Sequence, residues 1–327
     1  MAETYEFYKL EPLFGPNSMR VTRARTYEGR FAMTLLSLFP GVTLAWNCIY
    51  CESLPTEKGI GAPFSEVPIA INIGLKGSCE VERLDGSVSA LRAGEASVSR
   101  VASIRKQCFP GKVYEGVEVF LEPERVAEEF PELEQWFGIR EEDWETLYYV
   151  ATGAKICKCN TAVHRGAERL MKRFSSLTAE QLPAMRLEVL QLLRELCENP
   201  LPESGHTYLT EAQASLARTM EQRMTEDLRA HVYARDLAQE YGLSDTSLKN
   251  YFRVLYGRPV SEYMRAVRMK EAARLLLETD LSVGRIAEEV GYQNQSKFAA
   301  VFRETYGTSP LAYRRSHRTL SKHSETK

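Results

Sequence analysis

The fold is decided by a pattern that occurs twice, first as YARDLAQEYGLSDTSLKNYFRVLYGRPV (233–260) and again as VGRIAEEVGYQNQSKFAAVFRETYGTSPLAYRR (283–315). The glycine near the start of the pattern recurs 49 positions later (291 − 242), and the aromatic residues behind it recur after 50 (302 − 252). An internal repeat of this length indicates a duplicated structural unit, with one additional residue in the second turn.

Each copy predicts a helix, a short turn and a second, amphipathic helix. In the first copy, Gly242 can adopt the left-handed conformation that ends a helix, and Ser244 can cap the helix that follows. The apolar residues of that helix recur at offsets of 0, 3, 4, 7 and 8, which places them on one inward face. They are Leu248, Tyr251, Phe252, Leu255 and Tyr256, and the second copy repeats the face as Phe298, Val301, Phe302, Thr305 and Tyr306, after Gly291 and the capping residue Asn294.

The outward faces of the two amphipathic helices are rich in hydrogen-bond donors. This arrangement is the helix-turn-helix pattern, whose second helix can enter the DNA major groove. One copy is weak evidence because ordinary helical hairpins share it, whereas two copies in register are far stronger. The residues expected to face DNA are Ser244, Thr246, Lys249, Asn250 and Arg253 in the first copy, and Asn294, Gln295, Ser296, Lys297 and Arg303 in the second, where Ala299 and Ala300 stand in place of Lys249 and Asn250.

The two copies are expected to play different roles. Lys249 and Arg253 suit phosphate or guanine, Asn250 can bind adenine through two hydrogen bonds, and Thr246 can contact a thymine methyl group. Because the second copy has alanine at two equivalent positions, we expect it to contribute less base recognition and more positioning. Between the copies, Ser261–Leu277 predicts one helix of roughly 25 Å that separates the two reading helices.

The last third of the chain resembles the signature of the AraC/XylS transcription regulators. The resemblance rests on Arg268–Leu276, Ile286-Ala287, Gly291-Tyr292, Phe298, Phe302, Gly307, Ser309-Pro310 and Tyr313-Arg314. It implies a seven-helix DNA-binding domain whose two recognition helices read successive major-groove segments on one face of the duplex. Many members carry an aromatic residue or histidine where Lys297 stands, and a basic residue where Asn250 and Ala300 stand, so the bases read here stay open.

Charge is distributed unevenly along this chain of 327 residues and net charge −2. Residues 221–327 contain 18 Lys and Arg against 14 Asp and Glu, a balance of +4, and the remainder contains 24 against 30, a balance of −6. A basic C-terminal part is consistent with phosphate binding, although chance variation of surface charge would also give +4. The length and the 44% hydrophobic content suffice for two domains with separate cores.

Residues 20–122 have the pattern of an antiparallel β domain, because short apolar runs alternate with glycine-containing turns. The predicted strands are Phe31–Phe39, Thr43–Tyr50, Val67–Leu75, Ser78–Leu84, Ser87–Leu91, Ala96–Val101 and Gly116–Leu121, separated among others by Lys76-Gly77 and Asp85-Gly86. Strands of this length predict a small barrel or jelly roll. The family resemblance implies a cupin-like barrel that serves as the effector domain.

Helices are expected after the strands, at Arg125–Phe137, Glu141–Ala151, Ala162–Phe174 and Ala179–Cys197, and again at Glu211–Asp227. The apolar stripe of Ala179–Cys197 has two equally weighted interpretations, because it can pair two subunits or pack on the barrel. The expected organisation is an α+β chain of two domains. It comprises an effector-binding and dimerisation domain at 1–198 (barrel at 20–122, helices at 123–198), a linker at 199–210, an all-α DNA-binding domain with two helix-turn-helix motifs joined by a long helix at 211–318, and a disordered tail at 319–327.

Two further sets of side chains are candidates for ligand binding. Trp46, Tyr50, Phe64, Arg83, Arg100 and Arg105 could line a barrel mouth that accepts a small anionic or aromatic effector, although each is individually more often a core or surface residue. Cys48, Cys51, Cys157 and Cys159 could hold zinc or respond to redox conditions. Against a metal site, Cys48 and Cys51 differ by three on a predicted strand and therefore point to opposite faces. Buried cysteine is also commonly a small apolar core residue.

Enzymatic activity is not expected, and neither is a cofactor. Cupin-like enzymes need clustered histidine and carboxylate ligands, but all five histidines lie outside the predicted barrel. No Ser/His/Asp arrangement or phosphate-binding glycine loop is recognisable. The longest apolar stretch, Phe31–Trp46, is interrupted by Pro40-Gly41 and too short to span a bilayer, and the start has no secretory pattern. A soluble cytoplasmic protein with reduced thiols is therefore expected.

These observations predict a sequence-specific regulator that binds double-stranded DNA as a homodimer, responds to a small effector, and contacts RNA polymerase as an activator. One alternative is a regulator that senses metal or thiol oxidation through the four cysteines. Another is a regulator whose N-terminal domain serves only for dimerisation.

Overall fold

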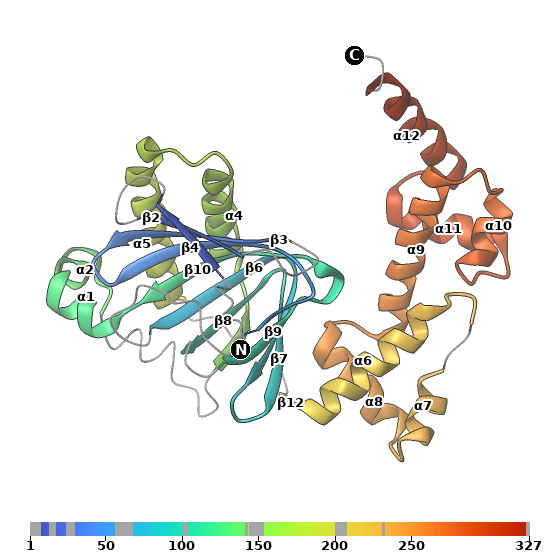
Figure 1. Cartoon of the computed structure of the whole chain (residues 1–327), viewed down its shortest axis with the longest axis horizontal. Helices are drawn as coiled ribbons and strands as arrows, with labels where there is room; N and C mark the ends of the chain where they lie inside the picture. The colour runs from blue at the N-terminus through green and yellow to red at the C-terminus, as the bar shows by residue number, and fades with distance from the viewer. Residues whose placement is uncertain are drawn as a thin grey trace, which may run out of the picture. The chain divides into compact units, whose positions relative to one another are not determined.

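The computed structural model describes residues 8–12, 18–23, 30–55, 68–100, 104–140, 143, 154–199, 208–230 and 233–324. The chain divides into two compact units, Met1–Tyr208 and Leu209–Lys327 (Figure 1). The first unit is an antiparallel sheet with helices, and the second is built from helices. The α+β class is therefore confirmed.

The strands of the first unit pair in an antiparallel manner along an open path. Their bounds are β1 Tyr8–Pro12, β2 Ser18–Arg23, β3 Arg30–Phe39, β4 Val42–Tyr50, β5 Ser53–Pro55, β6 Ile69–Arg83, β7 Ser87–Arg92, β8 Glu95–Arg100, β9 Ile104–Cys108, β10 Tyr114–Leu121 and β11 Ala154–Lys158. The main path is β1-β2-β3-β4-β10-β6-β7, and β8 and β9 also pair with β6. Because the described strands do not close into a ring, the expected cupin-like barrel is not confirmed.

One long strand replaces two of the predicted strands. The sequence predicts a break at Lys76-Gly77, but β6 continues through it. Its first half pairs with β8 and its second half with β7 and β9. Gly77 permits the bend between the halves, because it has a φ of +71° and because an added Cβ would lie 1.9 Å from the carbonyl oxygen of Val113. The two halves contribute Ala70 and Cys79 to one apolar interior.

Helices of the first unit pack against the sheet in a second apolar cluster, separate from the one that contains Ala70 and Cys79. They are α1 Pro123–Glu129, α2 Glu132–Phe137, α4 Thr161–Ser175 and α5 Leu182–Glu198, with short 3-10 turns at η2 Pro110–Lys112 and η3 Ala179–Gln181. The helix predicted at Arg125–Phe137 is divided into α1 and α2 at Pro131, and the one predicted at Glu141–Ala151 lies outside the described residues except for Asp143. The apolar stripe of α5, including Met185, Val189 and Leu193, is buried in one cluster with α4 and the sheet. Of its two interpretations, the structure therefore supports packing within the subunit.

The described part of the second unit forms the seven helices that the family resemblance implies. They are α6 Glu211–Glu226, α7 Ala234–Glu240, α8 Asp245–Tyr256, α9 Val260–Glu278, α10 Val283–Glu289, α11 Gln295–Tyr306 and α12 Pro310–Ser324. The two helix-turn-helix motifs are α7–α8 and α10–α11, and α9 is the predicted connecting helix. The sequence predicts a tail from residue 319, whereas α12 continues to Ser324.

The two motifs repeat each other down to the packing of their aromatic rings. In the first motif, the ring centroids of Phe252 lie 4.4 Å from Tyr256 and 5.3 Å from Tyr263. The equivalent distances from Phe302, to Tyr306 and Tyr313, are 4.7 and 5.4 Å. The residues of the predicted inward faces with the lowest exposure are Leu248 at 1%, and Phe252, Phe298 and Phe302 at 0%. The inward faces are therefore confirmed as the cores of the motifs except at Thr305, which is exposed and whose hydroxyl donates to the carbonyl oxygen of Val301 at 2.9 Å.

Among the helices within the described ranges, none is long and apolar enough to cross a membrane.

Candidate nucleic-acid interface

Both recognition helices begin at side-chain caps. Oγ of Ser244 accepts a hydrogen bond from the backbone N–H of Ser247 at 3.0 Å, and Oδ1 of Asn294 accepts one from the N–H of Lys297 at 2.9 Å. Such caps satisfy backbone donors that a helix start leaves unpaired. The predicted caps are thus confirmed, and they fix where α8 and α11 start.

The outward faces of α8 and α11 are open to solvent. The exposed side chains include all of those expected to face DNA, namely Ser244, Thr246, Lys249, Asn250, Arg253, Asn294, Gln295, Ser296, Lys297 and Arg303. The apolar residues between them point into the two cores. Each helix therefore presents a polar surface of the width that a major groove admits.

A groove of about 1300 Å³ lies between the two recognition helices. Six of the ten expected residues line it, which are Thr246, Lys249, Asn250, Arg253, Asn294 and Lys297. The other four, Ser244, Gln295, Ser296 and Arg303, are exposed outside this lining. The structure thus gathers most of the predicted residues around one concave surface.

The connecting helix α9 contributes Arg265 and Arg268 to the same groove. The sequence places both on this helix but does not assign them to the interface. Their spacing of three positions, which puts both on one face of a helix, is the signal that could have identified them. With them, the groove carries more basic than acidic side chains: Arg235, Lys249, Arg253, Arg265, Arg268 and Lys297 against Asp245 and Glu262. A basic concave surface suits the phosphates of a nucleic acid.

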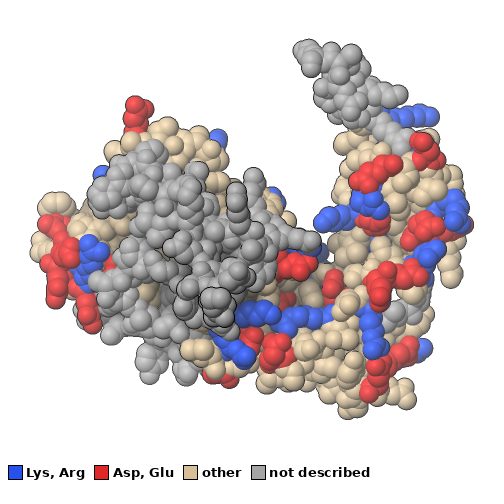
Figure 2. Space-filling model, in the orientation of Figure 1, with Lys and Arg blue, Asp and Glu red and all other residues tan. Residues whose placement is uncertain are grey.

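Internal contacts leave these side chains available. Nζ of Lys249 lies 2.6 Å from Oδ2 of Asp245, and Nη2 of Arg253 donates to Oδ1 of Asn250 at 3.3 Å. Ion pairs and hydrogen bonds on an exposed surface contribute little and can be exchanged for contacts to a ligand. Figure 2 shows both signs of charge interspersed on the visible face of this unit.

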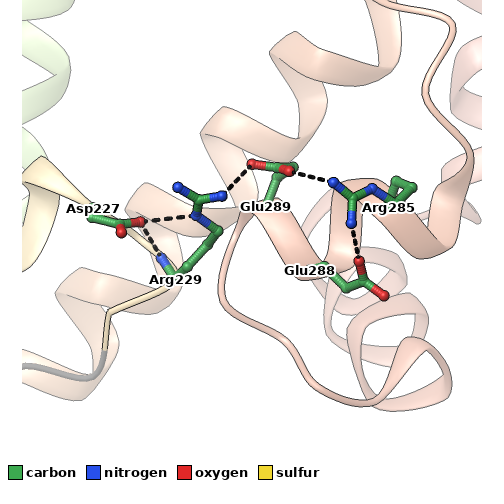
Figure 3. Close-up of polar contacts among 5 residues, drawn as sticks. All are labelled: Asp227, Arg229, Arg285, Glu288 and Glu289. Carbon is green, nitrogen blue, oxygen red and sulfur yellow. Dashed lines mark hydrogen bonds and ion pairs between the residues drawn. The ribbon is translucent and has the colours of Figure 1, made fainter.

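Charged residues connect the segment between α6 and α7 to the second motif (Figure 3). Arg229, which follows α6, donates from Nε to Oδ1 of Asp227 at 3.2 Å, and its Nη1 lies 3.7 Å from Oε2 of Glu289 on α10. Arg285 donates to Oε1 of Glu289 at 3.1 Å and to Oε2 of Glu288 at 2.6 Å. Glu289 therefore lies between two guanidinium groups, one from each side of the junction.

A closer backbone contact lies beside these ion pairs. The carbonyl oxygen of Leu228 accepts a hydrogen bond from Nη2 of Arg268 at 3.3 Å. The same oxygen would lie 2.1 Å from a Cβ added to Gly291, which has a φ of +80°. A glycine at 291 thus suits both the turn of the second motif and the close approach of the segment between α6 and α7.

The residues expected to bind an effector are dispersed. Trp46 packs on Phe174 of α4, with ring centroids 5.8 Å apart, and the hydroxyl of Tyr50 donates to Oε1 of Glu115 at 2.6 Å. Arg105 pairs with Oε1 of Glu82 at 2.9 Å, and its side chain is 65% exposed. Phe64 lies outside the described residues, as does the side chain of Arg100. Among the described side chains of this set, Arg83 is the one that lines an interior cavity.

The cysteine alternative gains no support. Among the described residues, no group of three or more His, Cys, Asp or Glu side chains is placed to hold a metal ion. Cys51 and Cys157 are buried, and burial raises the pKa of the Cys159 thiol to about 12. A thiol with a raised pKa forms little thiolate, which is the reactive species in metal binding and oxidation.

Known proteins are similar to the second unit of this chain. Residues 237–316 match the family model described as a helix-turn-helix domain. Over 116 residues the chain is 34% identical to the HTH-type transcriptional activator AarP of Providencia stuartii. This match covers 36% of this chain and 86% of AarP. It is 32% identical over 108 residues to the transcriptional activator NphR of Rhodococcus sp., covering 33% of this chain but 31% of NphR. A solved structure, the DNA-binding domain of AdpA in complex with a target DNA, matches 32% of this chain and 94% of that domain at 27% identity, with a TM-score of 0.30.

The match to AarP extends over most of that relative, and residues 237–316, which match the family model, run from within α7 to within α12. The seven helices, the two matching aromatic cores and the exposed polar faces agree with it. The chain belongs to the AraC/XylS family of DNA-binding transcription regulators.

Proposed function

We propose that this protein is a ligand-responsive transcription activator that reads two successive major-groove segments through α8 and α11. The observation that carries the proposal is the groove between the helices, because two exposed donor-rich faces border a floor that carries Arg265 and Arg268. Two helices that enter neighbouring major grooves on one face of DNA leave a sugar-phosphate backbone between them. A cationic floor between the helices would lie against those phosphates.

The two helices are proposed to divide the work of recognition. On α8, Asn250 reads an adenine and Thr246 contacts a thymine methyl group, while Lys249 and Arg253 bind phosphate or guanine. On α11, alanines at 299 and 300 leave fewer donors for base edges, so Lys297 and Arg303 act chiefly in positioning. Ser244, Asn294, Gln295 and Ser296 complete the contacts near the two helix starts, where backbone N–H groups favour phosphate.

The front half is proposed to supply regulation. Residues 1–198 would bind the effector and form the homodimer. The linker at 199–210 would join them to the DNA-binding domain at 211–318. As an activator, the protein would contact RNA polymerase. Relatives named as activators, AarP and NphR, support the direction of control. An alternative in which the front half only dimerises predicts no effector at all.

Selection of binding sites from random DNA with the full-length protein tests the proposal. The expected result is a bipartite motif with a better-defined half for α8. Lys249→Ala combined with Asn250→Ala should abolish enrichment of that half. Arg274→Ala is the matched control, because Arg274 is an exposed α9 residue outside the groove, paired with Glu271 and Glu278. Absence of any enriched motif, or equal effects of both variants, would overturn the proposal.

A further inference from the structure

A small cavity lined by both polar and apolar side chains lies inside the first unit, between the two halves of β6. Its volume is about 30 Å³. Asn72, Ser97 and Glu118 line one side, and Arg83, Ser89 and Gln107 line the other. A space of this size can hold a water molecule or the polar head of a small ligand, and its polar side chains provide hydrogen-bonding partners, while Val81, Leu91, Ile104 and Ile156 supply apolar surface.

Arg83 is the unusual member of this lining. The residue is 4% exposed, and its Nη2 donates to Oγ of Ser89 at 3.0 Å. Its Nε and Nη1 have no hydrogen-bond partner among the described residues. Burial of a charged group without full hydrogen bonding is unfavourable for folding. A buried guanidinium of this kind calls for a ligand that accepts hydrogen bonds.

The charge of Arg83 is also poorly compensated. Burial is the largest influence on its pKa and lowers it, while Tyr208 and Asp85 act in the opposite direction. The ring of Tyr208 lies 5.3 Å from the guanidinium carbon, and Asp85 lies in an exposed turn, where it accepts a hydrogen bond from the N–H of Ser87. A water molecule would accept hydrogen bonds from the free N–H groups but would leave the positive charge of Arg83 uncompensated. An anion would satisfy both.

The far side of the cavity does not exclude an anion. Glu118 accepts a hydrogen bond from Nδ2 of Asn47 at 2.8 Å, and burial raises the pKa of Glu118 to about 7. Near neutral pH a large share of this side chain is therefore uncharged and can donate a hydrogen bond. The hydroxyl of Ser89, which accepts from Arg83, keeps its own proton for a second acceptor.

We propose that this cavity binds the carboxylate head of a small monoanionic ligand, with Arg83 as the anchoring cation and Ser89 as a second donor. The inference deepens the proposed function by naming the chemical class of effector. It rests on that function only for the regulatory consequence, because binding of the anion can be measured without DNA.

The test uses the full-length protein and measures its unfolding temperature with formate or acetate as the probe. Acetamide, which has the shape of acetate without its charge, is the neutral control, and sodium chloride at equal ionic strength is the inorganic control. Acetate should raise the unfolding temperature in a saturable manner, as binding to the folded state requires, whereas acetamide should not. Arg83→Met should weaken the apparent affinity for acetate at least about tenfold. Arg194→Met, at an exposed residue of α5 paired with Glu198, should leave the response unchanged.

Several outcomes would overturn the inference. These are a wild-type protein that responds to neither formate nor acetate, a response to chloride equal to that to acetate, and an Arg83→Met variant that responds like the wild type. Should Arg83→Met fail to fold, Arg83→Lys keeps the charge but loses the planar donor set, and its acetate response should still fall. DNA binding by the same proteins is measured separately. A wild-type protein that binds no DNA would contradict the proposed function, whereas the result on anion binding would still stand.

Discussion

At the scale of single residues, Asn250 and Arg303 differ in what their side chains can recognise. An amide can form two hydrogen bonds to an adenine edge, whereas a guanidinium beside a backbone mainly contributes charge. Asn250→Ala should relax preference at one base pair and cost ~1–3 kcal/mol at the preferred sequence. Arg303→Ala should weaken binding to all sequences alike and reduce the salt dependence by about one phosphate contact. Binding-site selection combined with salt titration distinguishes the two, and indistinguishable effects would refute the division of labour.

A second residue-scale prediction concerns Glu118. Its pKa of about 7 in the folded protein lies above its ordinary value of 4.5. The contribution of this carboxyl group to stability is therefore fully present below pH 4.5 and is lost as the pH rises through 7. Glu118→Gln should remove this loss and raise the free energy of unfolding at pH 8, relative to wild type, by roughly 3 kcal/mol.

The measurement is chemical denaturation of both proteins at pH 5 and pH 8, monitored with a spectroscopic signal from the β-sheet unit. Glu134→Gln, at an exposed carboxylate of α2, provides the control and should change neither value. The prediction is contradicted if the wild-type sheet is more stable at pH 8 than at pH 5 and Glu118→Gln removes that gain.

At the scale of elements, the junction between the two motifs depends more on backbone approach than on its ion pairs. The ion pair between Arg229 and Glu289 lies at the surface, where ion pairs contribute little to stability. Gly291 differs from its counterpart Gly242 in one respect. Both have positive φ, but an added Cβ would contact Leu228 only at Gly291 and would meet nothing within 4 Å at Gly242.

Alanine at each of these two glycines gives a matched pair of variants. Gly242→Ala should suffer the conformational strain alone, about 1–2 kcal/mol. Gly291→Ala should suffer the same strain and also displace the two motifs, so it should lose DNA affinity and the protection of α11 amides from hydrogen exchange. Equal behaviour of the two variants in both measurements would show that the contact at Leu228 does not position the recognition helices.

At the scale of the whole molecule, the sequence predicts the second unit far better than the first. The repeat, the caps at Ser244 and Asn294 and the inward aromatic residues are local signals, and each is confirmed. In the first unit, Gly77 looks like a turn but bends a continuous strand, because the glycine signal does not distinguish the two. β9 and β11 were not predicted, since pairing partners far along the chain rather than local pattern make them strands.

The candidate sites follow the same division. Residues on one face of a helix share a surface by periodicity alone, so the exposed faces of α8 and α11 could be predicted, whereas Arg235, Arg265 and Arg268 in the groove were missed. The effector candidates could not be chosen from the sequence, because which side of a strand faces the interior depends on the register of its neighbours. Arg83 stands out only when its burial and its free N–H groups are known.

The central claim is that α8 and α11 occupy neighbouring major grooves of one DNA duplex. Hydroxyl-radical footprinting of the full-length protein on a selected site measures this directly. The account predicts two protected segments on one face of the duplex, about 10 base pairs apart, with protection of one segment lost on changing α8 and of the other on changing α11. A single protected segment that persists whichever helix is changed would contradict it.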